Sequence, residues 1–214
     1  MPGETAPFTV HVVDDDAAVL RSTAFLLRAA GYHAETYPSP TVLLDKLDTL
    51  SPGCVVTDVR MPGINGLELQ ERLAAERSDL PVIVITGHGD VSMAVRAMRA
   101  GATDFIEKPF TNEMLLGAVE SARNCIQRRR TEQAALEEIA ARMRRLTPRE
   151  REVMLLVAEG WTSKEIAKVL GLSHRTVELH RAMILGKMQA SSLAALIRMV
   201  LATEHDEGTR PGAI

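Results

Sequence analysis

The sequence predicts two domains of different fold class: a doubly wound, five-stranded parallel α/β sheet, and a small all-α domain of four helices that contains a helix-turn-helix. Short β-branched runs alternate with helical patterns over the first half of the chain. A stretch rich in Ala, Glu and Arg follows, and helix-start signals then repeat at short intervals. We expect domains at residues 1–122 and 146–203, a helical linker at 123–145 and a flexible tail at 204–214.

Composition limits the kind of protein that this chain is. Its 214 residues suffice for two hydrophobic cores, and 25% charged with 46% hydrophobic residues is typical of a soluble globular protein. No apolar run approaches the roughly 18 residues of a membrane span, so we expect a cytoplasmic protein without a membrane partner. Cys54 and Cys125 are far apart in sequence, which predicts reduced packing residues and argues against a disulfide or zinc site.

Charge differs between the two halves of the chain. Residues 1–122 hold 9 basic and 17 acidic residues, whereas residues 123–203 hold 15 basic and 8 acidic residues. A polyanion is the natural partner of a basic segment, so the second half is expected to bind one. The excess of positive charge is small and indicates only the class of partner.

The first domain is expected to alternate strands and helices in strict order. Apolar runs predict strands, and apolar residues spaced three and four apart predict the helices between them. The expected strands are residues 8–13, 34–37, 55–58, 81–86 and 104–107; the expected helices are residues 19–30, 41–50, 66–77 and 93–100, with a fifth that continues into the linker. Asp16 is expected to cap the first helix. This order predicts a parallel sheet with helices on both faces.

Four strands of this sheet end at polar side chains. Asp14 and Asp15 follow the first strand, Asp58 ends the third, Thr86 ends the fourth and Lys108 follows the fifth. Because the carboxyl ends of parallel strands meet at one edge, we expect these residues to converge there. Taken singly, Asp58 is also what a turn or a helix cap carries, and Lys108 is what a solvated loop carries. Their convergence predicts a site centred on Asp58.

These side chains favour phosphoryl transfer. Neighbouring carboxylates repel one another and need a counter-ion, and Mg²⁺ suits them because it takes oxygen ligands and retains waters. With a lysine ammonium opposite, Asp58 can attack phosphorus and Thr86 can donate to a phosphate oxygen, which predicts an aspartyl phosphate at Asp58. The rival interpretation is a phosphatase that hydrolyses an external ester. Such a phosphatase needs a second acidic residue as general acid, but Arg60 stands two residues beyond Asp58, where that acid is expected. We therefore expect that the protein is not an enzyme.

The second domain begins with repeated helix-start signals. Thr147–Glu150 and Thr162–Glu165 have the pattern of capping boxes, Gly171 ends the second helix, and Ser173 is placed to cap the third. A short helix, a glycine turn and a further helix form a helix-turn-helix, whose second helix enters the major groove of DNA.

Helical periodicity separates the two sides of the third helix. The core side is fixed by Val177, Ile184 and Met188; the opposite side, with Glu178 at its flank, carries Arg175, Leu179 and Ala182. Leu179 and Ala182 suit thymine methyl groups and Glu178 can accept from a cytosine amino group, although single exposed apolar residues are common on protein surfaces. His180 lies beside the core, where packing or a phosphate contact is expected.

Four motifs, at residues 12–15, 57–66, 85–90 and 100–110, make the first domain resemble the receiver domain of two-component response regulators of the FixJ/NarL type. The resemblance implies phosphorylation of Asp58 by a sensor histidine kinase. It implies Mg²⁺ held by Asp15, Asp58 and the backbone carbonyl of Arg60, with Asp14 acting through water. It also implies that Lys108 contacts the phosphate and that two residues switch conformation, Thr86 and Phe105. An ordinary core position explains Phe105 equally well.

Residues 146–154, 163–167 and 175–181 resemble the LuxR-type helix-turn-helix, and the match extends to about Ala202. The resemblance implies a fourth helix, after Ser191, that makes dimer contacts. The base contacts that it implies are Glu178, Leu179 and Ala182. The phosphate contacts are Lys164, Arg175, Thr176, His180 and Lys187, and Ser173 completes the DNA-binding candidates. Met188 replaces the usual leucine, and residues 190–192 lack the usual basic residue.

Together these features predict a transcriptional regulator that binds promoter DNA as a homodimer after phosphorylation of Asp58. A role for RNA polymerase as partner follows from the family resemblance alone. The alternative is a DNA-binding regulator that acts independently of phosphorylation and uses its first domain only for dimerisation.

Overall fold

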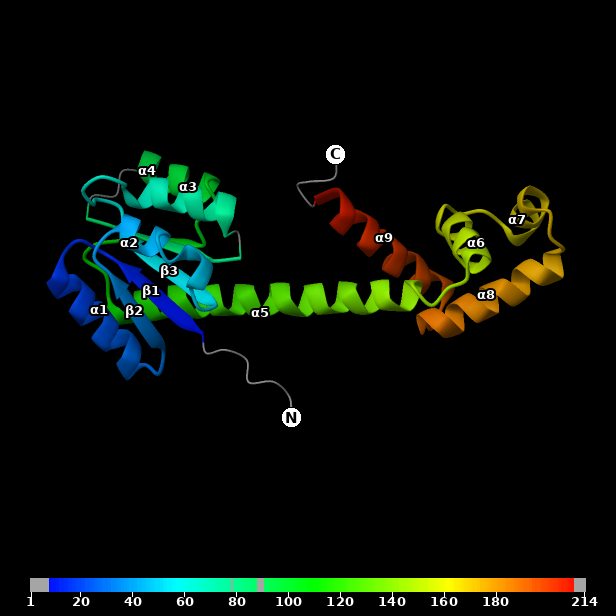
Figure 1. Cartoon of the computed structure of the whole chain (residues 1–214), viewed down its shortest axis with the longest axis horizontal. Coiled ribbons are helices and arrows are strands. Elements are labelled where there is room, and N and C mark those ends of the chain that lie inside the picture. Colours follow the sequence, from blue (N-terminus) through cyan, green and yellow to red (C-terminus); the bar gives the residue numbers. More distant parts are fainter. Residues whose placement is uncertain (1–7, 78, 88–90, 210–214) are drawn as a thin grey trace. The chain divides into compact units, whose positions relative to one another are not determined.

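A computed structural model describes residues 8–77, 79–87 and 91–209 and divides into two compact units, residues 1–129 and 130–214. The first unit is built on a five-stranded sheet in the order β2-β1-β3-β4-β5 (Figure 1). Its strands are β1 Thr9–Val13, β2 His33–Tyr37, β3 Gly53–Asp58, β4 Val82–Thr86 and β5 Asp104–Glu107. Every neighbouring pair is parallel, which confirms the predicted doubly wound sheet.

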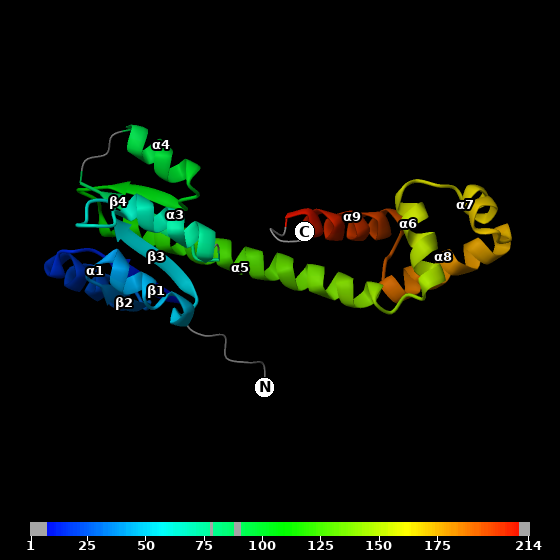
Figure 2. The same ribbon diagram turned by 45° about the horizontal axis from the view of Figure 1, so that its top comes forward.

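Helices cover both faces of this sheet, as Figure 2 shows. They are α1 Ala17–Ala29, α2 Pro40–Leu44, α3 Gly66–Glu76, α4 Val91–Arg99 and α5 Asn112–Met143. On one face, α1 and α5 pack through Leu27 and Val119 against Val56. On the other, α2 and α3 pack through Leu43 and Leu73. Asp16 caps α1 as predicted, since its carboxylate accepts from the amide of Ala18 at 2.7 Å.

The central strands are buried along their whole length because helices cover both of their faces. The edge strand β2 instead buries only Ala34 and Tyr37 of its five residues. Cys54, in the middle of β3, is fully buried, and burial raises the pKa of its thiol to about 12. This fits the predicted packing role, because a thiol with a raised pKa is unreactive at neutral pH.

The helix predicted at residues 41–50 is the one element of the first unit that differs clearly. The structure has the short helix α2, followed by a 3₁₀ turn, η1 Leu47–Thr49. The chain leaves helical geometry at Lys46, whose carbonyl accepts from both the amide and the hydroxyl of Thr49, at 2.9 Å each. A threonine hydroxyl that bonds a local carbonyl favours the tighter turn over a continued helix.

The second unit is helical. It holds the end of α5 and the helices α6 Pro148–Ala158, α7 Ser163–Leu170, α8 His174–Met188 and α9 Leu193–Thr209. Its core consists of apolar residues from these four helices, including Val153, Ile166, Ile184 and Leu196. Both predicted capping boxes are present, which explains where α6 and α7 begin.

Two boundaries of the second unit bear on the linker and the tail. The linker residues up to Met143 are helical as part of α5, and Ile139 and Met143 pack against the core of the second unit. Helix α9 continues to Thr209, so residues 204–209 of the expected flexible tail are helical, and residues 210–214 lie outside the described part.

No single helix in residues 8–77, 79–87 and 91–209 is long and apolar enough to cross a membrane. One bent pair, α8 with residues 193–203 of α9, passes that test by length and composition alone.

Candidate functional site

The register of the sheet brings the predicted strand-end residues to one edge. Val13 pairs with Thr57 and Asp58 with Ile85, so β1, β3 and β4 all end here. The turn after β5 returns to the same edge, because the amide of Lys108 donates to the carbonyl of Thr86 at 2.7 Å. Asp14, Asp58, Thr86 and Lys108 therefore lie at the same edge of the sheet, although they are spread over most of the first unit's sequence.

Both carboxylate oxygens of Asp58 are engaged. The amide of Arg60 donates to Oδ2 and the ammonium of Lys108 donates to Oδ1, at 2.6 Å each. The loop after β3 is closed by a hydrogen bond from the amide of Gly66 to the carbonyl of Val59. A Cβ at Gly66 would lie only 2.1 Å from the carbonyl oxygen of Asp58. Glycine is therefore required at position 66, because any side chain there would clash with the backbone of Asp58.

Lys108 also balances the second carboxylate at this edge. Its ammonium lies 3.6 Å from Asp14, whose other oxygen accepts from the amide of Asp16 at 2.8 Å. Burial raises the pKa of Asp14; the Asp16 amide and Lys108 oppose this shift, and the carboxylates of Asp58 and Asp15 add to it. Burial alone would lower the pKa of Lys108, but its hydrogen bond and charge interaction with Asp58 raise it. The lysine is thus held in its charged form.

The donor atoms at this edge fit Mg²⁺. Asp14 and Asp58 are buried beside one another, whereas Asp15 is exposed and, with Arg60, lines an adjoining cavity of about 610 Å³. In the part of the chain that the structure describes, no three His, Cys, Asp or Glu side chains are already gathered around one point. An all-oxygen set with few preassembled ligands suits a hard cation that keeps several waters.

Thr86 and Phe105, the two predicted switch residues, lie on neighbouring strands. Thr86 is fully buried at the end of β4. Phe105, on β5, is partly buried and packs against the core on the side of α3 and α4. This position fits both interpretations of Phe105, the core residue and the switch residue.

In the second unit, α7, a glycine turn and α8 form the predicted helix-turn-helix. Gly171 has a φ of +64° between the two helices, in the left-handed region that favours glycine. The hydroxyl of Ser173 accepts from the amide of Thr176 at 3.1 Å and caps α8. Val177, Ile184 and Met188 are fully buried, as the helical periodicity predicts.

Most of the expected DNA contacts lie on the surface. The side chain of Leu179 is 61% exposed, and the other exposed candidates are Lys164, Ser173, Arg175, Glu178 and Ala182. Thr176 and His180 are half-buried. The Nδ1 atom of His180 is buried without a hydrogen-bond partner among the described residues, which fits packing better than a phosphate contact.

Lys187, one of the expected phosphate contacts, has a partner within the protein. Its ammonium donates to both oxygens of Glu150, at 2.8 and 2.6 Å, and Glu150 is 1% exposed. This ion pair gives Lys187 a structural role, and the phosphate contact that the sequence predicts for it stays a prediction. Glu150 could be recognised from sequence as part of a capping box, but no local pattern signals a partner 37 residues away.

Glu178 also has a partner that the sequence does not reveal. Its carboxylate accepts from the hydroxyl of Ser163, the first residue of α7. Ser163 accepts in turn from Arg181 at 2.7 Å. Neither Ser163 nor Arg181 is among the candidates predicted from sequence, because their pairing depends on how α7 and α8 pack together.

Known protein families match both units. Residues 10–120 match the response regulator receiver domain, and residues 144–200 match the bacterial regulatory proteins of the luxR family. The transcriptional regulatory protein FixJ of Bradyrhizobium diazoefficiens is 45% identical over 192 residues, covering 90% of this chain and 94% of that protein. FixJ of Rhizobium meliloti is 44% identical over 195 residues, covering 91% and 96%.

Solved structures agree with these matches. The response regulator StyR has 40% sequence identity and a TM-score of 0.72, covering 92% of this chain and 99% of that one. Full-length FixJ from B. japonicum has 43% identity and a TM-score of 0.59, covering 94% and 99%.

Proposed function

Because this chain belongs to the response regulators that join a receiver domain to a LuxR-type DNA-binding domain, and so regulates transcription in response to phosphorylation, we propose that Asp58 is its phosphoacceptor. The observation that carries the proposal is the engagement of both Asp58 oxygens, by Lys108 and by the amide of Arg60, at the edge where Asp14 and Thr86 also lie. DNase footprinting with and without a small phosphodonor tests it, and protection that does not respond to the donor would contradict it.

In the proposed reaction, an oxygen of Asp58 attacks the phosphorus of a phosphohistidine on a sensor kinase. The new O–P bond forms as the P–N bond breaks, and the electron pair stays on the imidazole nitrogen. Lys108 is placed to meet the negative charge on the phosphoryl oxygens, since its ammonium already lies 2.6 Å from Asp58. When bound, Mg²⁺ supplies further positive charge; Asp15, Asp58 and the Arg60 carbonyl would hold it, with Asp14 acting through water.

We propose that Thr86 and Phe105 carry the signal away from Asp58. A phosphoryl group adds up to about two negative charges and three acceptor oxygens, to which the hydroxyl of Thr86 can donate. Movement of Thr86 toward the phosphate frees space beside β5, where Phe105 packs. Moving such an equilibrium from 1:99 to 99:1 needs about 5.5 kcal/mol, so partial activation is the expected outcome.

The proposed output is a homodimer that places two copies of α8 in successive major grooves of promoter DNA and acts through RNA polymerase. Arg175, Lys164, Ser173 and Thr176 would contact phosphates at the start of the two helices of the motif. Leu179 and Ala182 would contact bases. The chain would work in the cytoplasm, and its only phosphoryl chemistry would be the gain and loss of its own phosphate.

Two substitutions on α8 separate the proposed phosphate and base contacts. Arg175→Ala is expected to weaken binding to every duplex about tenfold and to reduce the salt dependence by about one phosphate contact. Leu179→Ala is expected to change the preferred base at one position of each half-site, at a cost of about 1 kcal/mol there. Fluorescence anisotropy on matched and mismatched duplexes measures both effects. Arg151→Ala, which replaces an exposed arginine on α6, is the control. Equal losses of affinity on every sequence for Arg175→Ala and Leu179→Ala would refute the assignment.

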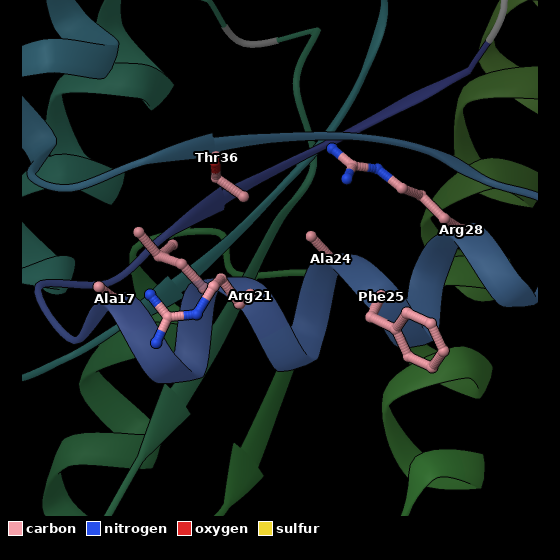
Figure 3. A pocket seen from close by; sticks show the side chains of 7 residues that line it. Ala17, Arg21, Ala24, Phe25, Arg28 and Thr36 are labelled. Carbon is pink, nitrogen blue, oxygen red and sulfur yellow. The ribbon is translucent and has the colours of Figure 1, made fainter.

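We propose α1 as the surface that meets the kinase. Phe25 is 76% exposed and lines a cavity of about 410 Å³, with Arg21 and Arg28 on the same helix (Figure 3). Helix α1 starts at Ala17, two residues after Asp15, so a protein docked here is close to Asp58. An exposed aromatic ring between two arginines suits a partner with an apolar anchor and acidic neighbours.

Phe25→Ala is expected to slow phosphotransfer from a sensor kinase about thirtyfold, the usual effect of removing an aromatic contact from the centre of an interface. Labelling by a small phosphodonor should stay unchanged, because Phe25 does not touch the Asp58 site. Single-turnover phosphotransfer measures the first and phosphate-affinity electrophoresis the second. Val42→Ala, another exposed apolar residue, is the control. Slow labelling by both donors would show that Phe25 supports the fold instead of the kinase contact.

A further inference from the structure

Ser163, Glu178 and Arg181 form a directed chain of hydrogen bonds between the two helices of the DNA-binding motif. Ser163 is the first residue of α7 and is 6% exposed; its hydroxyl donates to Oε1 of Glu178 and accepts from Nη1 of Arg181 at 2.7 Å. Glu178 and Arg181 are neighbours on α8, three residues apart. The serine hydroxyl therefore connects α7 to α8, the helix that is expected to enter the major groove.

The direction of these bonds follows from the chemistry of the groups. An arginine side chain only donates and an ionised carboxylate only accepts, so the serine hydroxyl between them must accept from Arg181 and donate to Glu178. Each bond has one charged partner, which makes it stronger than a bond between neutral groups. One carboxylate oxygen of Glu178 is held in this way, and the other remains an acceptor on an exposed side chain.

The carboxylate of Glu178 on α8 is unfavourable near the phosphates of DNA unless a base donates a hydrogen bond to it. The donor in the major groove that suits a glutamate is the amino group of cytosine, whereas guanine presents only acceptors there and repels a carboxylate. Glutamate is also long and flexible, so a contact from a free side chain would cost conformational entropy on binding. A glutamate side chain that is already held in place loses less conformational entropy on binding. It also rejects the wrong base more strongly, because it cannot move away from it.

We propose that Ser163 and Arg181 are positioning residues that hold Glu178 for reading one cytosine in each half-site. This inference rests on the proposed function, since it requires that α8 binds in the major groove. It assigns a specificity role to two residues that touch no base themselves. It also explains why a buried hydroxyl stands at the first position of α7, directly after the capping residue Thr162.

The test is selection of bound sequences from a pool of randomised duplex DNA, with the full-length chain activated by a small phosphodonor. Ser163→Ala is expected to reduce the preference for cytosine at one position about tenfold while affinity for a nonspecific duplex stays within about twofold. Glu178→Gln should lose the preference at the same position. Ser163→Thr keeps the hydroxyl and should restore it. Ser121→Ala removes an exposed hydroxyl on α5 and is the matched control.

The outcomes separate the inference from the function on which it rests. If Glu178→Gln loses the cytosine preference and Ser163→Ala keeps it, the glutamate reads the base without being positioned, and the inference fails. If Glu178→Gln keeps the preference, Glu178 reads no base and the inference also fails. If the activated wild-type chain selects no sequence at all, the proposed DNA-binding function fails first. The fluorescence of Trp161 shows whether each variant is folded, because it is the chain's one tryptophan.

Discussion

Replacing Asp58 by asparagine is expected to abolish phosphorylation and the rise in DNA affinity that follows it. Asparagine has nearly the same shape and keeps one oxygen for Lys108, so the sheet edge should remain intact, but a neutral amide cannot attack phosphorus. The wild-type chain should take up about one phosphate per molecule from a small phosphodonor and bind DNA about tenfold more tightly, within the range usual for allosteric coupling. The variant should show neither change.

Phosphate-affinity electrophoresis and quantitative footprinting measure these two effects. Asp45→Asn, the same substitution at the exposed end of α2, is the matched control and should behave as wild type. Equal affinities of the wild-type chain with and without the donor would support the alternative in which the receiver only dimerises. Multiple turnovers of a phosphate ester by the wild-type chain would instead support an external phosphatase activity.

Replacing Glu150 by alanine is expected to lower the free energy of unfolding of the DNA-binding unit by about 2 kcal/mol. This is less than the roughly 3–5 kcal/mol for breaking a fully buried ion pair, because water still reaches Lys187. The substitution removes the carboxylate partner of Lys187, whose own side chain is 33% exposed. It also opens the capping box of α6, in which Glu150 accepts from the amide of Thr147 at 2.7 Å. Urea unfolding followed by the fluorescence of Trp161 reports on this unit alone, because the chain's one tryptophan lies in it.

The same ion pair predicts how stability depends on pH. The hydrogen bond from Lys187 and that from the Thr147 amide hold the pKa of Glu150 below its ordinary value of 4.5. A carboxylate with a lowered pKa in the folded state contributes its full stability above 4.5 and loses it as the pH falls through the folded value. The wild-type chain should therefore lose more stability on acidification than Glu150→Gln, which has no proton to gain at this position.

A surface pair provides the contrast for both measurements. Glu152 bonds Arg149 at 2.6 Å, but both side chains are more than a third exposed. Its replacement by alanine should cost less than about 1 kcal/mol. A loss as large as that of Glu150→Ala would show that burial of Glu150 is not what makes its ion pair important.

The features that could be predicted from sequence are those that depend on local order or on simple topology. The capping boxes at Thr147 and Thr162 span only four residues each, so their pattern is complete in the sequence. The approach of Lys108 to Asp58 links distant residues, yet it follows from the parallel order of the strands, which places all their carboxyl ends at one edge.

The features that could not be predicted depend on how helices pack. The partners Lys187 and Glu150 belong to α8 and α6, and the partners Ser163 and Arg181 belong to α7 and α8; no periodicity relates their positions. The end of α2 was missed because the bond from the Thr49 hydroxyl to Lys46 competes with an otherwise good helical pattern. Only the bond from Thr49 is local; the other two pairs join side chains that the folded chain alone brings near.

The pairing of Lys108 with Asp58 has opposite effects on the rate of phosphorylation. An ammonium 2.6 Å from the attacking oxygen makes that oxygen a weaker nucleophile, so the resting chain should resist donors with poor leaving groups. The same ammonium is already oriented toward the charge that develops during transfer, so little reorganisation energy is needed once a reactive donor arrives. One short contact thus provides both chemical inertness at rest and a low barrier toward an activated phosphoryl group.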